Sequence, residues 1–172
     1  MEKLADCHQS QEILQVLRDF AAHPRGFLLM AGSNGTGKTY ASKAVGRECR
    51  ISQPYSSEFP GKIFVKQANL NTRLNEYRSM WGNVRYLEKY YAHPELLIID
   101  DLGTRTPSEA FMDFLYVLVD DRYDNRHRKG TIITTNLTAS QMRERFGDAF
   151  TSRAASGKLL RMDGDDRRFE EF

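Results

Sequence analysis

The chain has 172 residues, of which 40% are hydrophobic and 28% are charged, and its formal net charge is +2. These values indicate one globular domain with a core and exclude a disordered chain. Because the net charge is only mildly basic, any nucleic-acid role must rest on local clusters of basic residues and not on bulk charge. No apolar run approaches the ~18 residues that a membrane span needs, and the first residues lack the apolar stretch of a signal peptide, so we expect a cytoplasmic protein without a membrane partner.

Cysteine and histidine side chains show no spacing that is typical of a metal site. Cys7 and Cys49 form no C-x-x-C pair, and the four histidines are scattered along the chain. We expect two free thiols, one half-buried and one exposed, in a reducing cytoplasm.

Predicted helices and strands alternate along the chain. Residues 10–22 place apolar side chains at helical spacing, with Ser10 as the expected N-cap. Further helices are predicted at 38–50, 68–80, 86–91, 108–125 and 139–156, the last with a break near Gly147. Short apolar or β-branched runs predict strands at 27–31, 63–67, 96–100, 131–135 and 158–162. Prolines and serines predict a loop at 51–61.

Three of these strands, at 27–31, 96–100 and 131–135, are continuous apolar or β-branched runs. Such runs are typical of a parallel sheet that helices cover on both faces. The sequence therefore predicts an α/β fold, a three-layer sandwich around a parallel sheet. Because ligands bind at the carboxyl ends of the strands in such sheets, we expect the chemistry to lie there.

A glycine-rich segment follows the first predicted strand and matches the phosphate-loop pattern G-x-x-x-x-G-K-[ST] at every fixed position. Its residues are Gly32, Ser33, Asn34, Gly35, Thr36, Gly37, Lys38 and Thr39. The glycines allow backbone N–H groups to approach phosphates, and the helix that follows presents its positive end to the same charge. Lys38 is expected to reach the β- and γ-phosphates of ATP, and the Thr39 hydroxyl to ligate Mg²⁺. A chance glycine-rich turn is the alternative, and the strand before and the helix after disfavour it.

Polar residues also follow two later strands. Asp100 is expected to hold Mg²⁺, and Asp101 to polarise a water for attack on the γ-phosphate. Two solvated carboxylates would be the alternative, but paired acids beside a phosphate loop favour a cation site. Asn136, after the strand at 131–135, could hold the attacking water, although Thr-Thr-Asn alone is more often the start of a turn.

The segments GSNGTGKT, LLIIDDLG, VDDRY and TIITTNL together resemble the AAA+ ATPases. The closest resemblance is to the branch of bacterial helicase loaders, DnaC and DnaI, and of the related IstB transposition helpers, and it covers about residues 10–168. It implies a P-loop NTPase of AAA+ type whose five parallel strands have the order 5-1-4-3-2. It also implies a single AAA+ ATPase domain over 1–172, with a leading helix at 1–22, a core at 23–168 and a tail at 169–172.

Two arginines acquire roles only through this resemblance. In the family, a Ser-Arg pair supplies an arginine finger to the nucleotide of the neighbouring subunit, and Ser152-Arg153 stands at that position. A Gly-x-x-x-Arg segment after the last strand makes Arg168 a candidate second sensor arginine that contacts the nucleotide. For both, the alternative is an ordinary surface arginine.

The sequence departs from the resemblance at three points. Loaders grip the replicative helicase with an N-terminal domain, whereas few residues precede the first strand here, so a trimmed chain and a naturally short form are both open. Arg105 stands where relatives often carry an acid. No helical lid is predicted after the core, which agrees with the loader branch and not with AAA+ unfoldases.

The segment 68–91 interleaves arginines with Tyr77, Trp81 and Tyr86. This mixture suits single-stranded DNA, because cations follow the phosphates and aromatic rings stack on bases. Alternatively the aromatic residues belong to the core and the arginines to solvated helix faces. The resemblance favours DNA, because this part of the fold lines the DNA-facing channel of loaders.

Together the residues and the resemblance predict the ATPase domain of a DNA replication helicase loader, which uses ATP and Mg²⁺ and assembles on single-stranded DNA with ATP at the subunit interfaces. Self-association would occur through Arg153, and the resemblance implies a replicative DNA helicase as the partner. A transposition or phage-encoded helper ATPase, and a nucleotide-gated binding module with little turnover, are the alternatives. A small-molecule kinase is disfavoured, because no lid with acceptor-site arginines is found.

Overall fold

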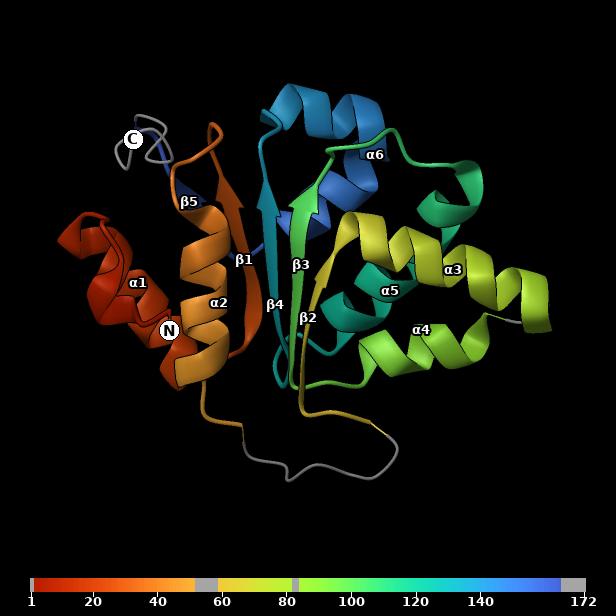
Figure 1. Ribbon diagram of the computed structural model, residues 1–172, viewed down its shortest axis with the longest axis horizontal. Helices are drawn as coiled ribbons and strands as arrows, with labels where there is room; N and C mark the ends of the chain where they lie inside the picture. The colour runs from red at the N-terminus through yellow and green to blue at the C-terminus, as the bar shows by residue number, and fades with distance from the viewer. Residues whose placement is uncertain (1, 52–58, 82–83, 165–172) are drawn as a thin grey trace.

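A computed structural model describes residues 2–51, 59–81 and 84–164. Its centre is a five-stranded parallel sheet that helices cover on both faces (Figure 1). The strands are β1 Gly26–Ala31, β2 Lys62–Lys66, β3 Leu96–Leu102, β4 Gly130–Thr135 and β5 Lys158–Arg161. Their order is β2-β3-β4-β1-β5, which confirms the predicted three-layer α/β sandwich and its 5-1-4-3-2 topology.

The helices form two layers, with α1 and α2 on one face of the sheet and α3 to α6 on the other (Figure 1). They are η1 Leu4–Asp6, α1 Gln11–Ala22, α2 Lys38–Glu48, α3 Gln67–Trp81, α4 Arg85–Ala92, α5 Glu109–Asp124 and α6 Ala139–Ala154. Alternate residues of the central strands supply the two cores, so that Leu28 and Met30 pack under α1 and α2 while Phe27 and Leu29 pack under the other layer. Within the described ranges, no helix is both long enough and apolar enough to cross a membrane.

The short helix η1 was not predicted, and Cys7 is its C-cap residue. Leu4 is buried, and its backbone N–H donates to the carboxylate of Glu48 at 2.7 Å, which fixes η1 against the end of α2. Cys7 and Cys49 are both buried in the core on this side of the sheet. The expectation of one exposed thiol was therefore wrong, and burial raises the pKa of each thiol to about 11.

The last helix carries the predicted break. Gly147 has φ 80° and ψ 164°, and a Cβ at this position would lie 2.7 Å from the hydroxyl of Tyr116. Thr138 and Gln141 form a capping box that begins the helix. The break therefore sets the direction of the second half of α6, which carries Arg153.

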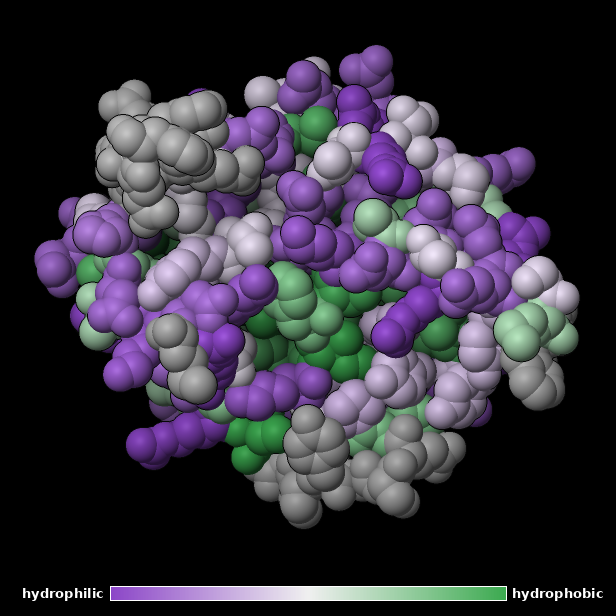
Figure 2. All heavy atoms as spheres, in the orientation of Figure 1, coloured by the Kyte–Doolittle hydropathy of each residue, from purple (hydrophilic) through white to green (hydrophobic). Residues whose placement is uncertain are grey.

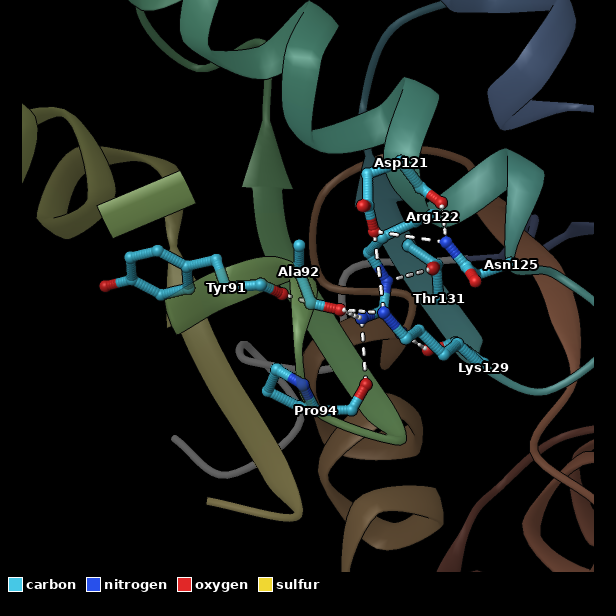
Figure 3. Close-up of polar contacts among 9 residues, drawn as sticks. Tyr91, Ala92, Pro94, Asp121, Arg122, Asn125, Lys129 and Thr131 are labelled. Carbon is cyan, nitrogen blue, oxygen red and sulfur yellow. Dashed lines mark hydrogen bonds and ion pairs between the residues drawn. The ribbon is translucent and has the colours of Figure 1, made fainter. Parts of the chain in front are cut away.

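A buried arginine joins three elements at the amino end of the sheet (Figure 3). Arg122 of α5 is fully buried, and its guanidinium donates to the Thr131 hydroxyl at 2.6 Å. It also donates to the carbonyls of Ala92 at 3.1 Å, Pro94 at 2.9 Å and Gly130. Burial lowers the pKa of Arg122 to about 9, so the side chain is still charged at neutral pH. It therefore ties α5 to the end of α4 and the start of β4.

Strand β2 forms one edge of the sheet, and apolar side chains are exposed beside it. Figure 2 shows hydrophobic surface over β2 that is framed by hydrophilic side chains. A hollow of about 330 Å³ there is lined by Ile63, Phe64 and Ile98, with basic side chains at its rim: Lys43, Arg47 and Lys62. This face of the molecule therefore combines apolar surface with positive charge.

Candidate functional site

The glycine-rich segment forms a loop between β1 and the first residue of α2, at the carboxyl edge of the sheet. Gly37 is the N-cap of α2 and has φ 87°, in the left-handed region that a side chain disfavours. Gly32 passes so close to the chain after β5 that a Cβ would lie 2.0 Å from the carbonyl oxygen of Met162. These two positions require glycine, and the loop conformation follows from them.

The side chain of Lys38 folds back over this loop. Its Nζ donates to the carbonyl oxygens of Gly32, at 2.9 Å, and of Ser33, and it lies 3.4 Å from the Thr36 hydroxyl. Lys38 is only 8% exposed, so its charge is held inside the loop and at the amino end of α2. Both features concentrate positive potential where the sequence predicts phosphate groups.

A hollow of about 250 Å³ opens between this loop and the ends of β3 and β4. Its lining includes most of the residues that the sequence analysis singled out, together with Tyr40 and Thr134, which it did not: Asn34, Gly35, Gly37, Lys38, Thr39, Tyr40, Asp101, Thr134 and Asn136. The parallel sheet thus brings together side chains that are about 100 residues apart in the sequence.

Asp100 lies beneath this hollow. Its carboxylate is fully buried and accepts hydrogen bonds from the Thr39 hydroxyl, at 2.9 and 3.2 Å, and from the Thr134 hydroxyl, at 2.7 Å. A carboxylate and a hydroxyl at the side of a phosphate site are the oxygen ligands that Mg²⁺ prefers in proteins. The residues present therefore fit the predicted metal, with Thr39 and Asp100 as the groups that would hold it.

Asp101 adopts an unusual backbone conformation. Its φ is 65°, and its backbone N–H donates to the Thr134 hydroxyl at 2.8 Å. The pairing of β3 with β4 shifts register between Ile99 and Leu102. This irregularity, of the kind often found beside active sites, accompanies the placement of Asp101 in the lining of the hollow.

The two candidate arginines are not part of the hollow's described lining. Arg153 lies on α6, where its Nε pairs with the Asp120 carboxylate of α5 at 2.7 Å and its guanidinium lies 5.9 Å from the ring of Tyr123. The pair joins two helices of the same chain. Arg168 lies outside the described residues, so its assignment stays a prediction.

Thr134 is one of the site residues that sequence reasoning missed, and Tyr40 is another. The two threonines at the end of the run Thr131–Thr135 were a signal for a polar site residue, but the sequence analysis assigned that role to the amide of Asn136. Gln9 was also missed: its side-chain amide donates to the carbonyl of Thr36 at 2.8 Å, which fixes the segment before α1 to the loop. Neither contact is visible without the fold, because both join segments that are distant in sequence.

The strand order, the loop after β1 and the acidic pair in β3 define a P-loop nucleotide-binding protein with the fold of the AAA+ ATPases. The family model described as IstB-like ATP binding protein matches residues 7–162, and the chain belongs to this family.

Curated relatives come from insertion sequences. A protein of Sinorhizobium fredii named as an insertion sequence ATP-binding protein is 28% identical over 134 residues, which are 77% of this chain and 50% of that protein. The insertion sequence IS232 ATP-binding protein of Bacillus thuringiensis subsp. berliner is 26% identical over 133 residues, again 77% of this chain and 49% of that protein. The chain thus spans about half the length of these relatives.

Solved structures share the fold. The DnaC helicase loader superposes with a TM-score of 0.76 at 22% identity, over 94% of this chain and 96% of that chain. The replication initiator DnaA bound to AMPPCP and single-stranded DNA superposes with a TM-score of 0.79 at 18% identity, over 95% of this chain and 50% of that chain. At such identities the likeness is one of fold.

Proposed function

We propose that this chain binds ATP with Mg²⁺ in the hollow beside the phosphate loop and hydrolyses it, as part of an assembly that forms on DNA. The observation that carries the proposal is the grouping of Lys38, Thr39, Asp101 and Asn136 around one hollow, with Asp100 hydrogen-bonded to Thr39 beneath it. The family and the AMPPCP-bound DnaA neighbours support ATP as the nucleotide.

The residues suggest how hydrolysis proceeds. Lys38 and the N–H groups of the loop bind the β- and γ-phosphates, and Mg²⁺, when bound, neutralises phosphate charge. Asn136 holds a water in line with the γ-phosphorus, and Asp101 takes a proton from that water as its oxygen attacks. The bond from phosphorus to the oxygen of ADP then breaks. Each of these groups comes from a different strand end, which explains why the fold must be complete before the site exists.

A neighbouring subunit completes the site in this proposal. Arg153 would reach the nucleotide of the next copy and stabilise charge on the transferred phosphoryl group. The side chain is 33% exposed, and its present partner is a carboxylate of its own chain. Insertion into a neighbour's site therefore requires that Arg153 exchange Asp120 for the nucleotide.

Single-stranded DNA is the proposed nucleic-acid ligand, and it would contact the surface formed by α3 and α4. This surface exposes four basic side chains: Arg73, Arg78, Arg85 and Lys89. The rings of Tyr77 and Tyr86 stack on each other, with centroids 5.9 Å apart and an interplanar angle of 10°. Tyr77 also packs against the core, whereas Tyr86 is 44% exposed, so Tyr86 is the better placed to stack on a base.

Insertion-sequence transposition is the process that we favour, because the curated relatives are named for insertion sequences. The protein partner would then be a transposase. Stronger binding of double-stranded DNA than of the single-stranded DNA proposed above would support this process over helicase loading. Loading of a replicative helicase is the second candidate, because nearly the whole of the DnaC structure superposes on this chain. Pull-down with the purified transposase or helicase separates the two.

ATP turnover and calorimetric ATP binding, each with and without DNA, test the proposed chemistry. Lys38→Ala should weaken ATP binding at least tenfold, about 1.4 kcal/mol or more. Arg153→Ala should bind ATP normally but lose hydrolysis on the order of 10³-fold, because the finger acts only on the reacting phosphate. Arg143→Ala, an exposed arginine on the same helix, is the control. Equal turnover of wild type and Arg153→Ala would remove the finger assignment.

A further inference from the structure

Thr134 contacts both acids of the candidate site with a single oxygen atom. Its Oγ1 lies 2.7 Å from Asp100 Oδ1 and 2.8 Å from the backbone nitrogen of Asp101. The side chain is 1% exposed and belongs to β4, which lies between β3 and β1 in the sheet. The oxygen is therefore held by a central strand and has little freedom to move.

The direction of each hydrogen bond follows from the chemistry of the groups. A backbone N–H only donates, so the Thr134 oxygen accepts from Asp101. A threonine hydroxyl has one hydrogen, and the carboxylate of Asp100 is the acceptor within reach. Thr134 thus donates to one acid while it accepts from the backbone of the next, and one side chain fixes both.

The contact with Asp101 coincides with the distortion of β3. Asp101 is the sole residue other than glycine with a positive φ in the described part of the chain. Its N–H bonds to a side chain of β4, at the point where the β3–β4 register shifts. The Thr134 hydroxyl therefore compensates the N–H that the irregular backbone turns away from the regular ladder.

We propose that Thr134 is a positioning residue for the nucleotide site: its hydroxyl orients Asp100 toward Mg²⁺ and holds the backbone turn that places Asp101 in the hollow. The inference rests on the proposed function. Thr39 also contacts Asp100, but its hydroxyl is the expected metal ligand. Among the described residues, Thr134 is then the remaining side-chain donor that holds the carboxylate in place. Groups that orient a ligand in this way are worth ~10–100-fold in metal affinity or activity.

Two substitutions at this position and one elsewhere on β4 separate positioning from packing. Thr134→Val keeps the shape of the side chain but loses the hydroxyl, whereas Thr134→Ser keeps the hydroxyl. Thr131→Val is the matched control, because Thr131 is also fully buried and its hydroxyl also forms a hydrogen bond, but to Arg122 at the other end of the strand.

In the full chain, Thr134→Val should bind ATP in EDTA within about twofold of wild type, because the phosphate loop is unchanged. The Mg²⁺ concentration for half-maximal enhancement of ATP binding should rise ~10-fold or more, and kcat should fall ~10–100-fold with little change in KM. Thr134→Ser should recover most of both losses. Thr131→Val should lower the melting temperature and leave the Mg²⁺ requirement unchanged.

An unchanged Mg²⁺ requirement and an unchanged kcat in Thr134→Val would overturn the proposal. So would equal effects of Thr134→Val and Thr131→Val, since both variants lose one buried hydroxyl. If wild type itself neither binds nor hydrolyses Mg²⁺-ATP, the proposed function fails. The crystal structure of Thr134→Val then still decides the positioning role: Asp101 leaving the left-handed region supports it, and Asp101 staying there overturns it.

Discussion

Asp101 holds a backbone conformation that most side chains avoid, with φ at 65°. For a residue with a Cβ this region is unfavourable, by on the order of 1 kcal/mol for Asp and Asn and more for bulkier residues. The surrounding contacts maintain it: the N–H donates to Thr134, and the carbonyl accepts from the Thr104 hydroxyl at 2.7 Å. Strain at Asp101 indicates that the placement of its carboxylate in the hollow is kept at the expense of some stability of β3.

Asp101→Gly should therefore stabilise the fold while removing hydrolysis. Glycine adopts φ 65° freely, and both backbone hydrogen bonds are retained, so we expect a gain of about 0.5–1 kcal/mol and a rise in Tm of ~1–4 °C. Scanning calorimetry measures the change. Asp101→Asn is the control, because Asn tolerates this region as Asp does and should leave Tm nearly unchanged. A lower Tm for Asp101→Gly would show that the carboxylate itself supports the fold.

At the scale of elements, the buried Arg122 side chain donates hydrogen bonds to backbone carbonyls, which an apolar side chain could not do. Its guanidinium satisfies carbonyls at the end of α4 and the start of β4, where regular hydrogen bonding has stopped (Figure 3). The acceptors come from two separate segments, residues 92–94 and 130–131, so one side chain of α5 fixes how α4 and α5 meet the sheet. Helix α4, which forms part of the proposed DNA surface, is anchored to the core partly through this residue.

Arg122→Met should be strongly destabilising, by at least ~3 kcal/mol, because it leaves several buried carbonyls without a donor. Urea unfolding followed by circular dichroism measures the loss. Arg126→Met is the comparison: this arginine is exposed on the loop that follows α5, donates to the Tyr123 carbonyl, and should cost ~0.5 kcal/mol or less. Similar losses in both variants would contradict the anchoring role of Arg122.

The elements themselves were largely predictable, because apolar periodicity reports which faces are buried. The stripe of α5 that begins at Phe111 is buried as expected, and the strands lie where the apolar runs placed them. The three residues of η1 were not predictable, because so short a segment has no periodicity, and the burial of Cys7 depends on it. The phosphate loop was predictable because its pattern is local. The contacts of Thr134 were not, since they join strands that are brought together only in the sheet.

For the whole molecule, the pair between Arg153 and Asp120 would link the conformation of one subunit to assembly, if Arg153 has the proposed finger role. The two side chains are 33% and 55% exposed, so water weakens their attraction, and such pairs are worth ~0.2–1 kcal/mol. This pairing competes with the proposed insertion of Arg153 into a neighbour's site. A pair of this strength can be displaced, and in the proposed assembly it would bias the equilibrium toward separate subunits.

Asp120→Asn should therefore promote assembly in the presence of an ATP analogue. The substitution removes a competing ion pair worth ~0.2–1 kcal/mol. The protein concentration at which the subunits associate should therefore fall about 1.5- to fivefold. Sedimentation velocity measures the shift, and Asp121→Asn, which removes a neighbouring charge, controls for net charge. Weaker assembly of Asp120→Asn would contradict this prediction. It would mean that Asp120 contacts the partner subunit in the assembly in addition to its pair with Arg153.

The position of β1 in the sheet determines when the phosphate loop can fold during synthesis of the chain. The strand that leads into the phosphate loop pairs with β4 on one side and β5 on the other, and both are synthesised after it. Gly32, the first residue of the loop, also packs against the carbonyl of Met162. A nascent chain that has left the ribosome only as far as α5 thus carries the loop sequence without either supporting strand. The ATP site consequently forms only after β4 and β5 have been synthesised, although the loop that is expected to contact the phosphates precedes both strands in the chain.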